Sequence, residues 1–325
     1  MKRFKKVLCV CPSSGSQVRA VEQALSLARS NQAILTIVDV IPQGILSAGG
    51  LPGAPSVDEL KSRIMASRHR ELRQAVEQAG GDDDIQIEVF FGTLFLEVIR
   101  AVLRNRHDLV IKAAENPGWT QRLFGSDDMH LLRKCPCPVW MVRPGERPEY
   151  ATILAAVDLD LPEPDRPVDT HSENQSLNAQ IIDLGVAMSL SGFAQLHIVH
   201  AWDAPEIEFA SMWTNQPETA EVRLLDAERS RHKAAMTRLT DQLRERIGPD
   251  SYDFISPSIH LPKGDARTVV PEQAKMIKAD LVIMGTVGRT GIQGLIIGNT
   301  AEAILDQLSC SVIAVKPQGF TSPVG

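Results

Sequence analysis

One pattern of residues occurs twice along the chain of 325 residues. The run Asp108-Leu-Val-Ile111 recurs as Asp280-Leu-Val-Ile283. Further on, the spacing from Gly125 to Pro144 equals the spacing from Gly298 to Pro317. Within those limits the matching positions are Leu132 and Leu305, Cys137 and Cys310, Val139 and Val312, and Val142 and Val315. Self-similarity of this kind indicates an internal duplication, so both halves should share one fold.

Short apolar segments occupy equivalent places in the two halves. Val7–Val10 matches Ile153–Ala156, and Ile34–Val40 matches Gln195–Ala201. In the second half, strands are predicted near residues 152–158, 195–201, 256–261, 280–285 and 311–316. Helix-length amphipathic segments separate these strands, and that alternation is typical of a parallel sheet covered by helices on both faces. The predicted fold class is therefore α/β, with two tandem doubly wound domains.

Apolar residues at helical spacing predict the helices between the strands. They are expected near residues 17–30, 57–79, 93–106 and 126–134 in the first half, and over 178–189 and 218–247 in the second. Prolines and a glycine in Arg143–Pro148 place the boundary there, with residues 1–147 as the first domain and 148–325 as the second. Two long stretches rich in glycine, proline and polar residues, 43–56 and 161–174, are expected to be surface loops.

The charge balance argues against a nucleic-acid surface. The chain has 34 lysines and arginines against 40 aspartates and glutamates, a formal net charge of −6, and its basic residues are scattered. No apolar stretch approaches the roughly 20 residues of a membrane helix. The apolar run Val7–Val10 is too short for a signal peptide and is predicted to be a first strand. We therefore expect a cytoplasmic protein without nucleic-acid or membrane partners.

The five cysteines are predicted to be buried thiols. Cys9 and Cys11 lie in an apolar run, while Cys135 and Cys137 flank a proline before a predicted strand. An odd total fits a reducing compartment better than a disulfide framework. A metal site is the alternative for either Cys-x-Cys pair, but a second pair at zinc-finger spacing is lacking, and free cysteine is among the most buried residue types.

A glycine motif follows the fourth predicted strand of the second half. Apolar Leu281–Met284 is followed by Gly285, two residues, Gly288, nine residues and Gly298, which opens a helix together with Asn299 and Thr300. Glycine lets the backbone approach a ligand closely and adopts positive φ in a turn. The free amides and positive dipole end of the following helix favour an anion above the strand. The motif therefore predicts a phosphate site.

This spacing resembles that of the ATP-binding members of the universal stress protein family, and the duplication resembles its tandem two-domain branch. The resemblance covers nearly the whole chain, including the run 280–285. It implies two five-stranded parallel sheets of order 3-2-1-4-5, in which the ends of strands one and four meet where open α/β sheets bind ligands. One departure is Asn299, where the family often has serine or threonine, although an amide can also cap a helix and bind phosphate.

The resemblance implies ATP as the cofactor, with or without Mg²⁺. The residues expected to bind it are Asp158, Ala201, Met284, Gly285, Gly288, Arg289, Gly298, Asn299 and Thr300. Asp158, at the end of a first strand, would bond the ribose or the adenine, and Ala201 would line the base pocket. A cap on the following loop is the alternative role of Asp158.

Three further side chains near the motif have simpler alternatives. Arg289 is the cation nearest the glycine turn and suits bidentate phosphate contact; a solvated charge is its alternative role. Lys263 is a less favoured substitute for it. His200 is interpreted as a packed strand histidine rather than a catalyst.

The first half has lost most of this motif. Ala113–Trp119 stands in place of the glycine turn, the segment is one residue shorter, and the pair Gly125-Ser126 is what remains. Pro12 stands where the second half has Asp158. The run Ser13–Ser16 faintly resembles a pyrophosphatase loop but lacks its aspartate. One ATP per chain, in the second domain, is therefore expected.

Three functions are compatible with these patterns. The leading hypothesis is an ATP-binding regulatory or stress-protective protein, in which nucleotide tunes binding to an unidentified protein partner. A slow ATPase is the second, although the sequence lacks the set of base, magnesium carboxylate and transition-state device that phosphoryl transfer needs, and no catalytic residue is assigned. The third is a scaffold that binds an apolar ligand or a protein near Phe95, Trp119 and Phe124.

The resemblance also implies a mode of assembly. Universal stress domains generally pair along their last strands, so segments 138–143 and 311–316 are expected to pair as an intramolecular pseudo-dimer, with a homodimer as a further possibility. Pairing would protect edges that otherwise invite aggregation.

Overall fold

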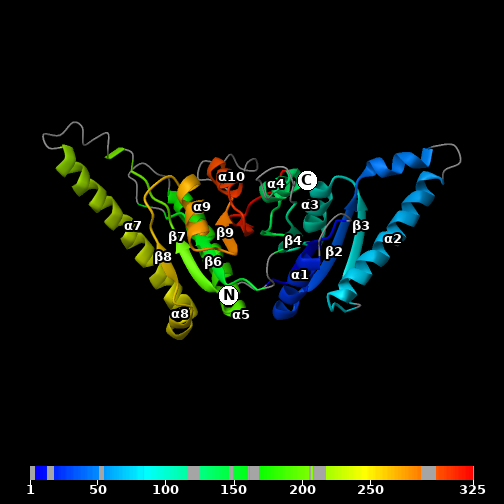
Figure 1. The fold of residues 1–325 in the computed structure, drawn as a ribbon, viewed down its shortest axis with the longest axis horizontal. Helices are drawn as coiled ribbons and strands as arrows, with labels where there is room; N and C mark the ends of the chain where they lie inside the picture. The colour runs from blue at the N-terminus through cyan, green and yellow to red at the C-terminus, as the bar shows by residue number, and fades with distance from the viewer. Residues whose placement is uncertain are drawn as a thin grey trace. The chain divides into compact units, whose positions relative to one another are not determined.

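The computed structural model describes residues 4–12, 18–50, 55–82, 84–115, 124–145, 149–159, 161, 168–204, 206–207, 217–286 and 298–324. These residues form two compact units (Figure 1). The N-terminal unit holds the described residues up to Glu149 and the stretch that starts at Ser309. The C-terminal unit holds those from Tyr150 to Thr286 and from Gly298 to Leu308.

In the part of the N-terminal unit that the structure describes, six strands form the sheet, in the order β3-β2-β1-β4-β5-β10. They are β1 (Lys6–Val10), β2 (Ile34–Ile41), β3 (Gln86–Phe91), β4 (Leu109–Ala113), β5 (Val139–Val142) and β10 (Ser311–Val315). The first five are parallel, which confirms the predicted order 3-2-1-4-5 for the first repeat. Successive residues of β1, β4 and β5 are buried, as expected for strands covered on both faces.

The helices of the N-terminal unit fall where the periodicity predicts them. They are α1 (Val18–Asn31), α2 (Val57–Gln78), α3 (Leu94–Asn105) and α4 (Ser126–Lys134). Ser56 starts α2 by accepting a hydrogen bond from the amide of Glu59. The expected loop at 43–56 is wrong in its first part, because Gln43–Gly50 forms a 3₁₀ helix, η1, that packs against α2. Apolar Ile45 and Leu46 interrupt the polar run that suggested a loop.

The last strand of the chain belongs to the sheet of the first repeat. β10 pairs with β5 in antiparallel register, with Val312 opposite Met141 and Ile313 opposite Trp140. The backbone amide of Arg143 adds a hydrogen bond of 2.9 Å to the hydroxyl of Ser311. The expected pairing of the two final strands is confirmed.

The C-terminal unit contains four parallel strands in the order β8-β7-β6-β9. They are β6 (Thr152–Ala156), β7 (Gln195–Val199), β8 (Ser258–His260) and β9 (Leu281–Gly285). The fold class of two doubly wound α/β repeats is confirmed. The expected five strands in each domain need one correction: within the described residues the units hold six and four, because β10 pairs with β5 and is grouped with the N-terminal unit.

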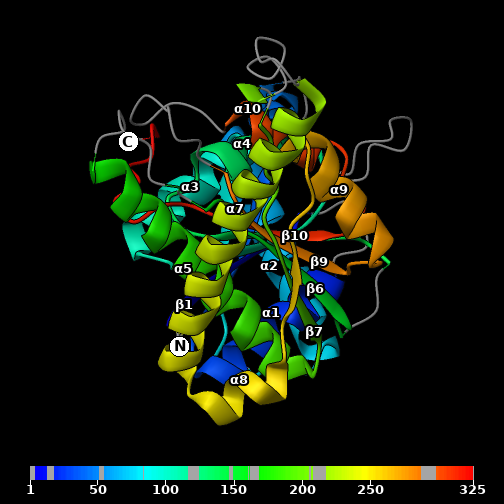
Figure 2. The same cartoon turned by 90° about the vertical axis from the view of Figure 1, so that its left-hand side faces the viewer.

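Five helices are described in the C-terminal unit. They are α5 (Val168–Gly192), α7 (Pro217–Ile247), α8 (Pro249–Ile255), α9 (Ala266–Met276) and α10 (Asn299–Leu305). Figure 2 shows the long α7 continuing into α8. The loop expected at 161–174 is wrong from Val168 onward, because α5 begins there with a polar stretch that lacks apolar periodicity but also lacks proline and glycine.

Two further sequence predictions concern the cysteines and membrane-spanning helices. All five cysteines are buried free thiols, as predicted. Among the described residues, no helix combines the length and the apolarity needed to cross a membrane.

Candidate functional site

The end of β9 and the start of α10 meet in the C-terminal unit. The backbone amide of Gly298 donates a hydrogen bond of 2.9 Å to the carbonyl oxygen of Thr286, the residue after β9. Gly298 is the N-cap of α10, which begins at Asn299. The first-turn amides of a helix have no partner within the helix. This backbone bond therefore places a set of amide donors beside the carboxyl end of β9.

The end of β6 lies at the same edge of the sheet. Ala156 is paired with Met284 in the parallel register of β6 and β9, so Asp158 and Thr286 each lie two residues beyond that pair. The buried amide of Asn178 fixes the backbone of Asp158: its Nδ2 donates to the Asp158 carbonyl at 2.7 Å, and its Oδ1 accepts from the Asp158 amide at 3.1 Å. The side chain of Asp158 is exposed to solvent.

Most of the expected site residues share this edge. Ala201 follows β7, whose residue Val199 is paired with Ala156. Met284 is buried in the core, so its backbone is the part that faces the sheet edge. Asn299 and Thr300 are exposed in the first turn of α10. Gly288 and Arg289 lie outside the described residues.

Gly285 has a structural role of its own. A Cβ atom on Gly285 would lie 2.8 Å from Cδ2 of Leu177 in α5, closer than real Cβ contacts allow. Leu177 is itself buried. A side chain at the end of β9 would therefore require Leu177 of α5 to shift, whether or not a ligand is present.

His200 belongs to a buried chain of polar contacts beneath the site. Its Nδ1 is 3.3 Å from the amide of Leu159, and its Nε2 is 2.9 Å from Nδ1 of His232 in α7. Nε2 of His232 lies 3.4 Å from a carboxylate oxygen of Glu228. The ring of His232 also stacks on Trp202. These contacts fit the interpretation of His200 as a packed histidine, because both of its nitrogens have protein partners.

Lys263 follows β8 and joins Trp202 through a parallel bridge of the backbone. The indole nitrogen of Trp202 donates to the carbonyl of Leu261 at 3.1 Å. These bonds extend the pairing of β7 and β8 beyond the strands and hold the segment after Ala201 in place.

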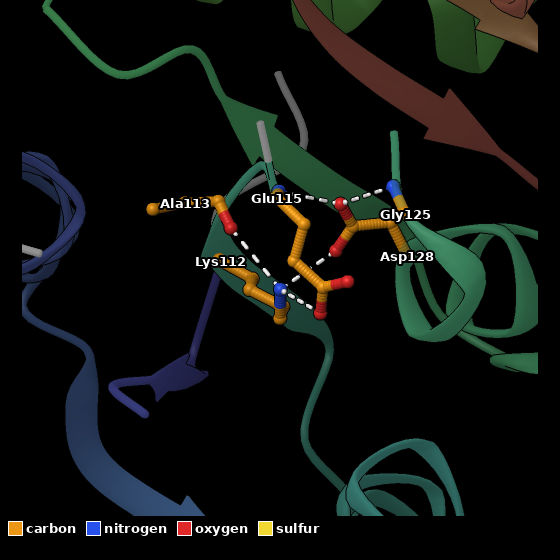
Figure 3. A network of polar contacts seen from close by, with 5 residues as sticks. All are labelled: Lys112, Ala113, Glu115, Gly125 and Asp128. Atoms are coloured by element: carbon orange, nitrogen blue, oxygen red, sulfur yellow. Dashed lines mark hydrogen bonds and ion pairs between the residues drawn. The ribbon is translucent and has the colours of Figure 1, made fainter. Parts of the chain in front are cut away.

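The corresponding edge of the first repeat contains a buried ion pair (Figure 3). Nζ of Lys112, in β4, is 2.7 Å from Oδ1 of Asp128 and 3.2 Å from Oε1 of Glu115. Lys112 and Asp128 are both almost fully buried. Oδ2 of Asp128 accepts hydrogen bonds from the backbone amides of Glu115 at 2.7 Å and Gly125 at 3.2 Å. Burial raises the pKa of Glu115, and the ammonium of Lys112 opposes that rise.

The repeats differ at matched positions. Aligning the run at 108 with the run at 280 sets Lys112 against Met284, and aligning Gly125 with Gly298 sets Asp128 against Ala301. In the first repeat, a carboxylate of the protein thus lies on the amides between the fourth strand and the following helix. The sequence shows both substitutions, but their significance was missed, because it depends on the contact between the two side chains.

The aromatic residues considered for an apolar ligand are already packed. Phe124 is buried, and Phe95 stacks on His130 with ring centroids 4.3 Å apart. Nζ of Lys134 lies 4.7 Å from the centroid of the Phe95 ring. Trp119 lies outside the described residues. The described aromatic rings therefore give no support to an open apolar cleft here.

Comparison with known proteins gives the family. The Universal stress protein family matches residues 3–143 and 167–316, which is one match for each repeat. The chain belongs to this family. Membership supports a stress-related function.

Among curated relatives of this universal stress protein, Universal stress protein E of Escherichia coli (strain K12) is 34% identical over 247 residues, covering 76% of this chain and 72% of the relative. The Universal stress protein E homolog of Haemophilus influenzae is 28% identical and covers 97% of this chain and 98% of the relative. These matches extend through both repeats and support a tandem protein similar to Universal stress protein E.

Solved structures support the fold of this universal stress protein. A putative universal stress protein from Pseudomonas aeruginosa UCBPP-PA14 matches with a TM-score of 0.68 at 24% identity, covering 97% of this chain and 94% of that chain. A universal stress protein from Archaeoglobus fulgidus DSM 4304 matches with a TM-score of 0.58 at 16% identity, covering 95% and 98%. At these identities the comparison concerns the fold.

Proposed function

We propose that this universal stress protein is a regulatory or stress-protective protein that binds one ATP, in its second repeat. The observation that carries the proposal is the hydrogen bond from Gly298 to Thr286, which sets the amide end of α10 beside the carboxyl end of β9. Ligands of open α/β sheets bind at such an edge, between the first and fourth strands. The resemblance of the glycine motif to ATP-binding relatives adds support.

The chemistry of this edge fits a nucleotide. Amide donors and the positive end of the α10 dipole attract phosphate, and Asn299 and Thr300 add polar side chains in the same turn. A helix dipole contributes about 0.3–1 kcal/mol, whereas millimolar binding corresponds to about 4 kcal/mol. The glycine turn at Gly288 and the cation of Arg289 are proposed to supply much of the difference.

Asp158 is proposed to bind the sugar or the base. Its backbone is held by Asn178, and its carboxylate is exposed at the end of β6. Ala201, at the end of the neighbouring strand, is proposed to line the base pocket. If Mg²⁺ accompanies the nucleotide, Asp158 is the carboxylate of this set that could approach it.

The first repeat is proposed not to bind nucleotide. Its equivalent edge holds the carboxylate of Asp128, which accepts two backbone amides and pairs with Lys112. A phosphate would have to displace the Asp128 carboxylate from these amides, and it would be repelled by the negative charge of that carboxylate. Regulation would then come from one nucleotide that favours one state of the second repeat and so alters partner binding.

The test uses a charge swap between matched positions of the two helices. Thr300 of α10 corresponds to Asp127 of α4, and Thr300 is exposed. Thr300→Asp places a carboxylate in the first turn of α10, where it favours the helix dipole but repels phosphate. Isothermal titration with ATP should give a stoichiometry near one for the wild type and at least tenfold weaker binding, about 1.4 kcal/mol, for Thr300→Asp.

The reverse swap, Asp127→Thr, is the matched control and should leave ATP affinity unchanged. Two ATP molecules per chain, or equal affinity in Thr300→Asp and the wild type, would contradict the proposal. Single-turnover hydrolysis in the same samples would show whether bound ATP is also cleaved.

A further inference from the structure

The N-terminal unit contains two Cys-x-Cys pairs with different geometry. Cys9 lies in β1 and Cys11 directly after it, whereas Cys135 and Cys137 lie between α4 and β5. All four thiols are buried. The same spacing therefore occurs in two local structures within one unit, which allows a direct comparison of the two pairs.

The sulfur atoms of Cys135 and Cys137 are in contact. They lie 3.6 Å apart, within the distance of a thiol hydrogen bond. Cys135 is the C-cap of α4, with φ of −68° and ψ of 131°, and its amide still donates to the carbonyl of Leu131. The chain leaves the helix there and turns at Pro136, and this turn brings the two side chains together.

A buried lysine of the last strand segment faces the same helix end. Nζ of Lys316 donates a hydrogen bond of 2.7 Å to the carbonyl of Leu132, three residues before Cys135. Burial lowers the pKa of Lys316 to about 7, and the negative charge of a Cys135 thiolate opposes that shift. Lys316 therefore still binds a proton at neutral pH in a part of the molecules.

The two thiols of this pair differ in acidity. Burial raises the pKa of Cys135, but the hydrogen bond from Cys137 and the charge of Lys316 outweigh it, so the pKa is lowered. The hydrogen bond to Cys135 and burial both raise the pKa of Cys137. Either sulfur can donate the hydrogen bond between them, but the charge of Lys316 acts on Cys135, which favours Cys135 as the sulfur that becomes a thiolate.

Cys9 and Cys11 lack this arrangement. In an extended strand, residues two apart are separated by about 6.6 Å, near the upper limit of the Cα distances that disulfides span. Within the described parts of the chain, no hydrogen bond joins these two sulfurs. Burial raises the pKa of Cys9 well above 9.0 and that of Cys11 to about 11, with the charge of Asp39 adding to the latter.

We propose that Cys135 and Cys137 form a peroxide-oxidisable dithiol, in which Cys135 reacts first and Cys137 closes the disulfide. The Cys135 thiolate attacks one oxygen of hydrogen peroxide, the O–O bond breaks, and the departing hydroxide takes up a proton to give water. Cys135 is then a sulfenic acid. The sulfur of Cys137 attacks that of Cys135, the S–O bond breaks, and hydroxide leaves with the Cys137 proton as a second water. Two thiols are oxidised and one peroxide is reduced.

Burial sets the speed and the selectivity of this reaction. Cys137 keeps 8% of its surface exposed and Cys135 keeps none, so a small oxidant is required and the reaction should be slower than at a free small thiol. The product would tie the C-cap of α4 to the residue two before β5. This inference is independent of nucleotide binding, because it concerns the N-terminal unit.

The test is a map of thiols in the full-length protein. The reduced protein is treated with hydrogen peroxide and then denatured in the presence of an alkylating reagent, which labels the remaining thiols. It is then digested and examined by mass spectrometry. The peptide that contains Cys135 and Cys137 should carry no alkyl groups, and its mass should be two hydrogens below that of the unalkylated reduced peptide. Reduction with dithiothreitol before alkylation should restore both alkyl groups. Cys9, Cys11 and Cys310 should remain alkylated at peroxide concentrations that oxidise the pair.

Variants identify the order of the two sulfurs. Cys137→Ser should accumulate a sulfenic acid at Cys135 that dimedone traps, whereas Cys135→Ser should give neither product. Lys316→Met should slow oxidation, while Lys134→Met, a charge on the same helix end, should leave the rate unchanged. Oxidation of Cys9 and Cys11 at the same rate, or a wild-type peptide that stays fully alkylated, would overturn the proposal. The wild-type map needs no variant, so misfolding of a variant cannot obscure the result.

Discussion

The two repeats use the same backbone edge in opposite ways. After β4, the buried pair of Lys112 and Asp128 supplies a carboxylate to two backbone amides. The matched residues of the second repeat, Met284 in β9 and Ala301 in α10, are uncharged. In the first repeat the protein itself thus supplies an anion to this edge, whereas in the second repeat we propose that a bound phosphate does.

A second matched pair follows the same rule. Asp39 in β2 pairs with Arg68 of α2 at 2.7 Å, while the residue at the position of Asp39 in the second repeat, His200, contacts His232 of α7. A contact between charged side chains in the first repeat thus corresponds to a contact between two histidines in the second. In both places the first repeat pairs a buried carboxylate with one of its own cations.

The largest expected effect comes from breaking the buried ion pair. Asp128→Ala should destabilise the protein by about 3–5 kcal/mol, because it leaves the charge of Lys112 buried without its closest partner. The double change Lys112→Met with Asp128→Ala installs the residues of the second repeat and should recover most of that loss. Urea unfolding of the four proteins in the cycle measures both values.

Asp127→Ala is the control for this cycle, since Asp127 lies in the same first turn of α4. A loss of stability in Asp128→Ala no greater than in Asp127→Ala would break the comparison between the repeats.

An intermediate effect is expected at Gly285. Gly285→Ala introduces the residue of the first repeat, Ala113, and its Cβ would press on Leu177. Overpacking of this kind costs about 1–3 kcal/mol. The cost should shrink in a Leu177→Ala background, and thermal unfolding without nucleotide measures it. If Gly285→Ala weakened ATP binding but left stability intact, the glycine would serve the ligand rather than the packing.

The smallest effect concerns pH. Nδ1 of His197 lies 2.8 Å from Nε2 of His260, and the matched residue in the first repeat, Thr36, contacts His107. Burial lowers the pKa of His197 and His260 below 6.5, and for His197 the charge of His260 adds to it. The unfolded chain therefore binds more protons as the pH falls through 6.5, and stability contributed by the pair is lost below that pH.

Unfolding at pH 7.5 and pH 5.5 checks this expectation. His260→Gln should lose less stability on acidification than the wild type, because one of the two shifted groups is gone. His69→Gln, at an exposed position of α2, should behave like the wild type. If the wild type and His260→Gln lost the same stability between pH 7.5 and pH 5.5, the histidine pair would not be the cause of that loss.

Much of the fold could be predicted from the sequence because hydrophobic periodicity and duplication report it directly. The strands and most helices follow from apolar runs such as Val7–Val10, whereas the strand order 3-2-1-4-5 is what the resemblance to the universal stress proteins implies. Prediction failed where polar residues continue a helix, as at the start of α5, since that stretch lacks the apolar spacing that marks a helix face.

The site was predictable in outline and less so in its details. The glycine spacing indicates the edge at which Thr286 and Gly298 meet, because glycine permits turns and close backbone approaches that other residues do not. The hydrogen bond from Asn178 to the backbone of Asp158 joins residues 20 positions apart, and the ion pair of Lys112 with Asp128 joins residues 16 positions apart. Such contacts depend on how strands and helices pack, which one sequence does not reveal.

The antiparallel pairing of β10 with β5 has a consequence for the order in which the chain can fold. Val312 pairs with Met141, so the sheet that starts with the first residues of the chain is finished by nearly the last ones. During synthesis, domains generally fold from the N-terminus. The edge of β5 therefore remains unpaired until β10, at the end of the second repeat, has been synthesised and has left the ribosome. Contacts so distant in sequence form slowly, so a nascent or truncated N-terminal half carries an open strand edge during that delay.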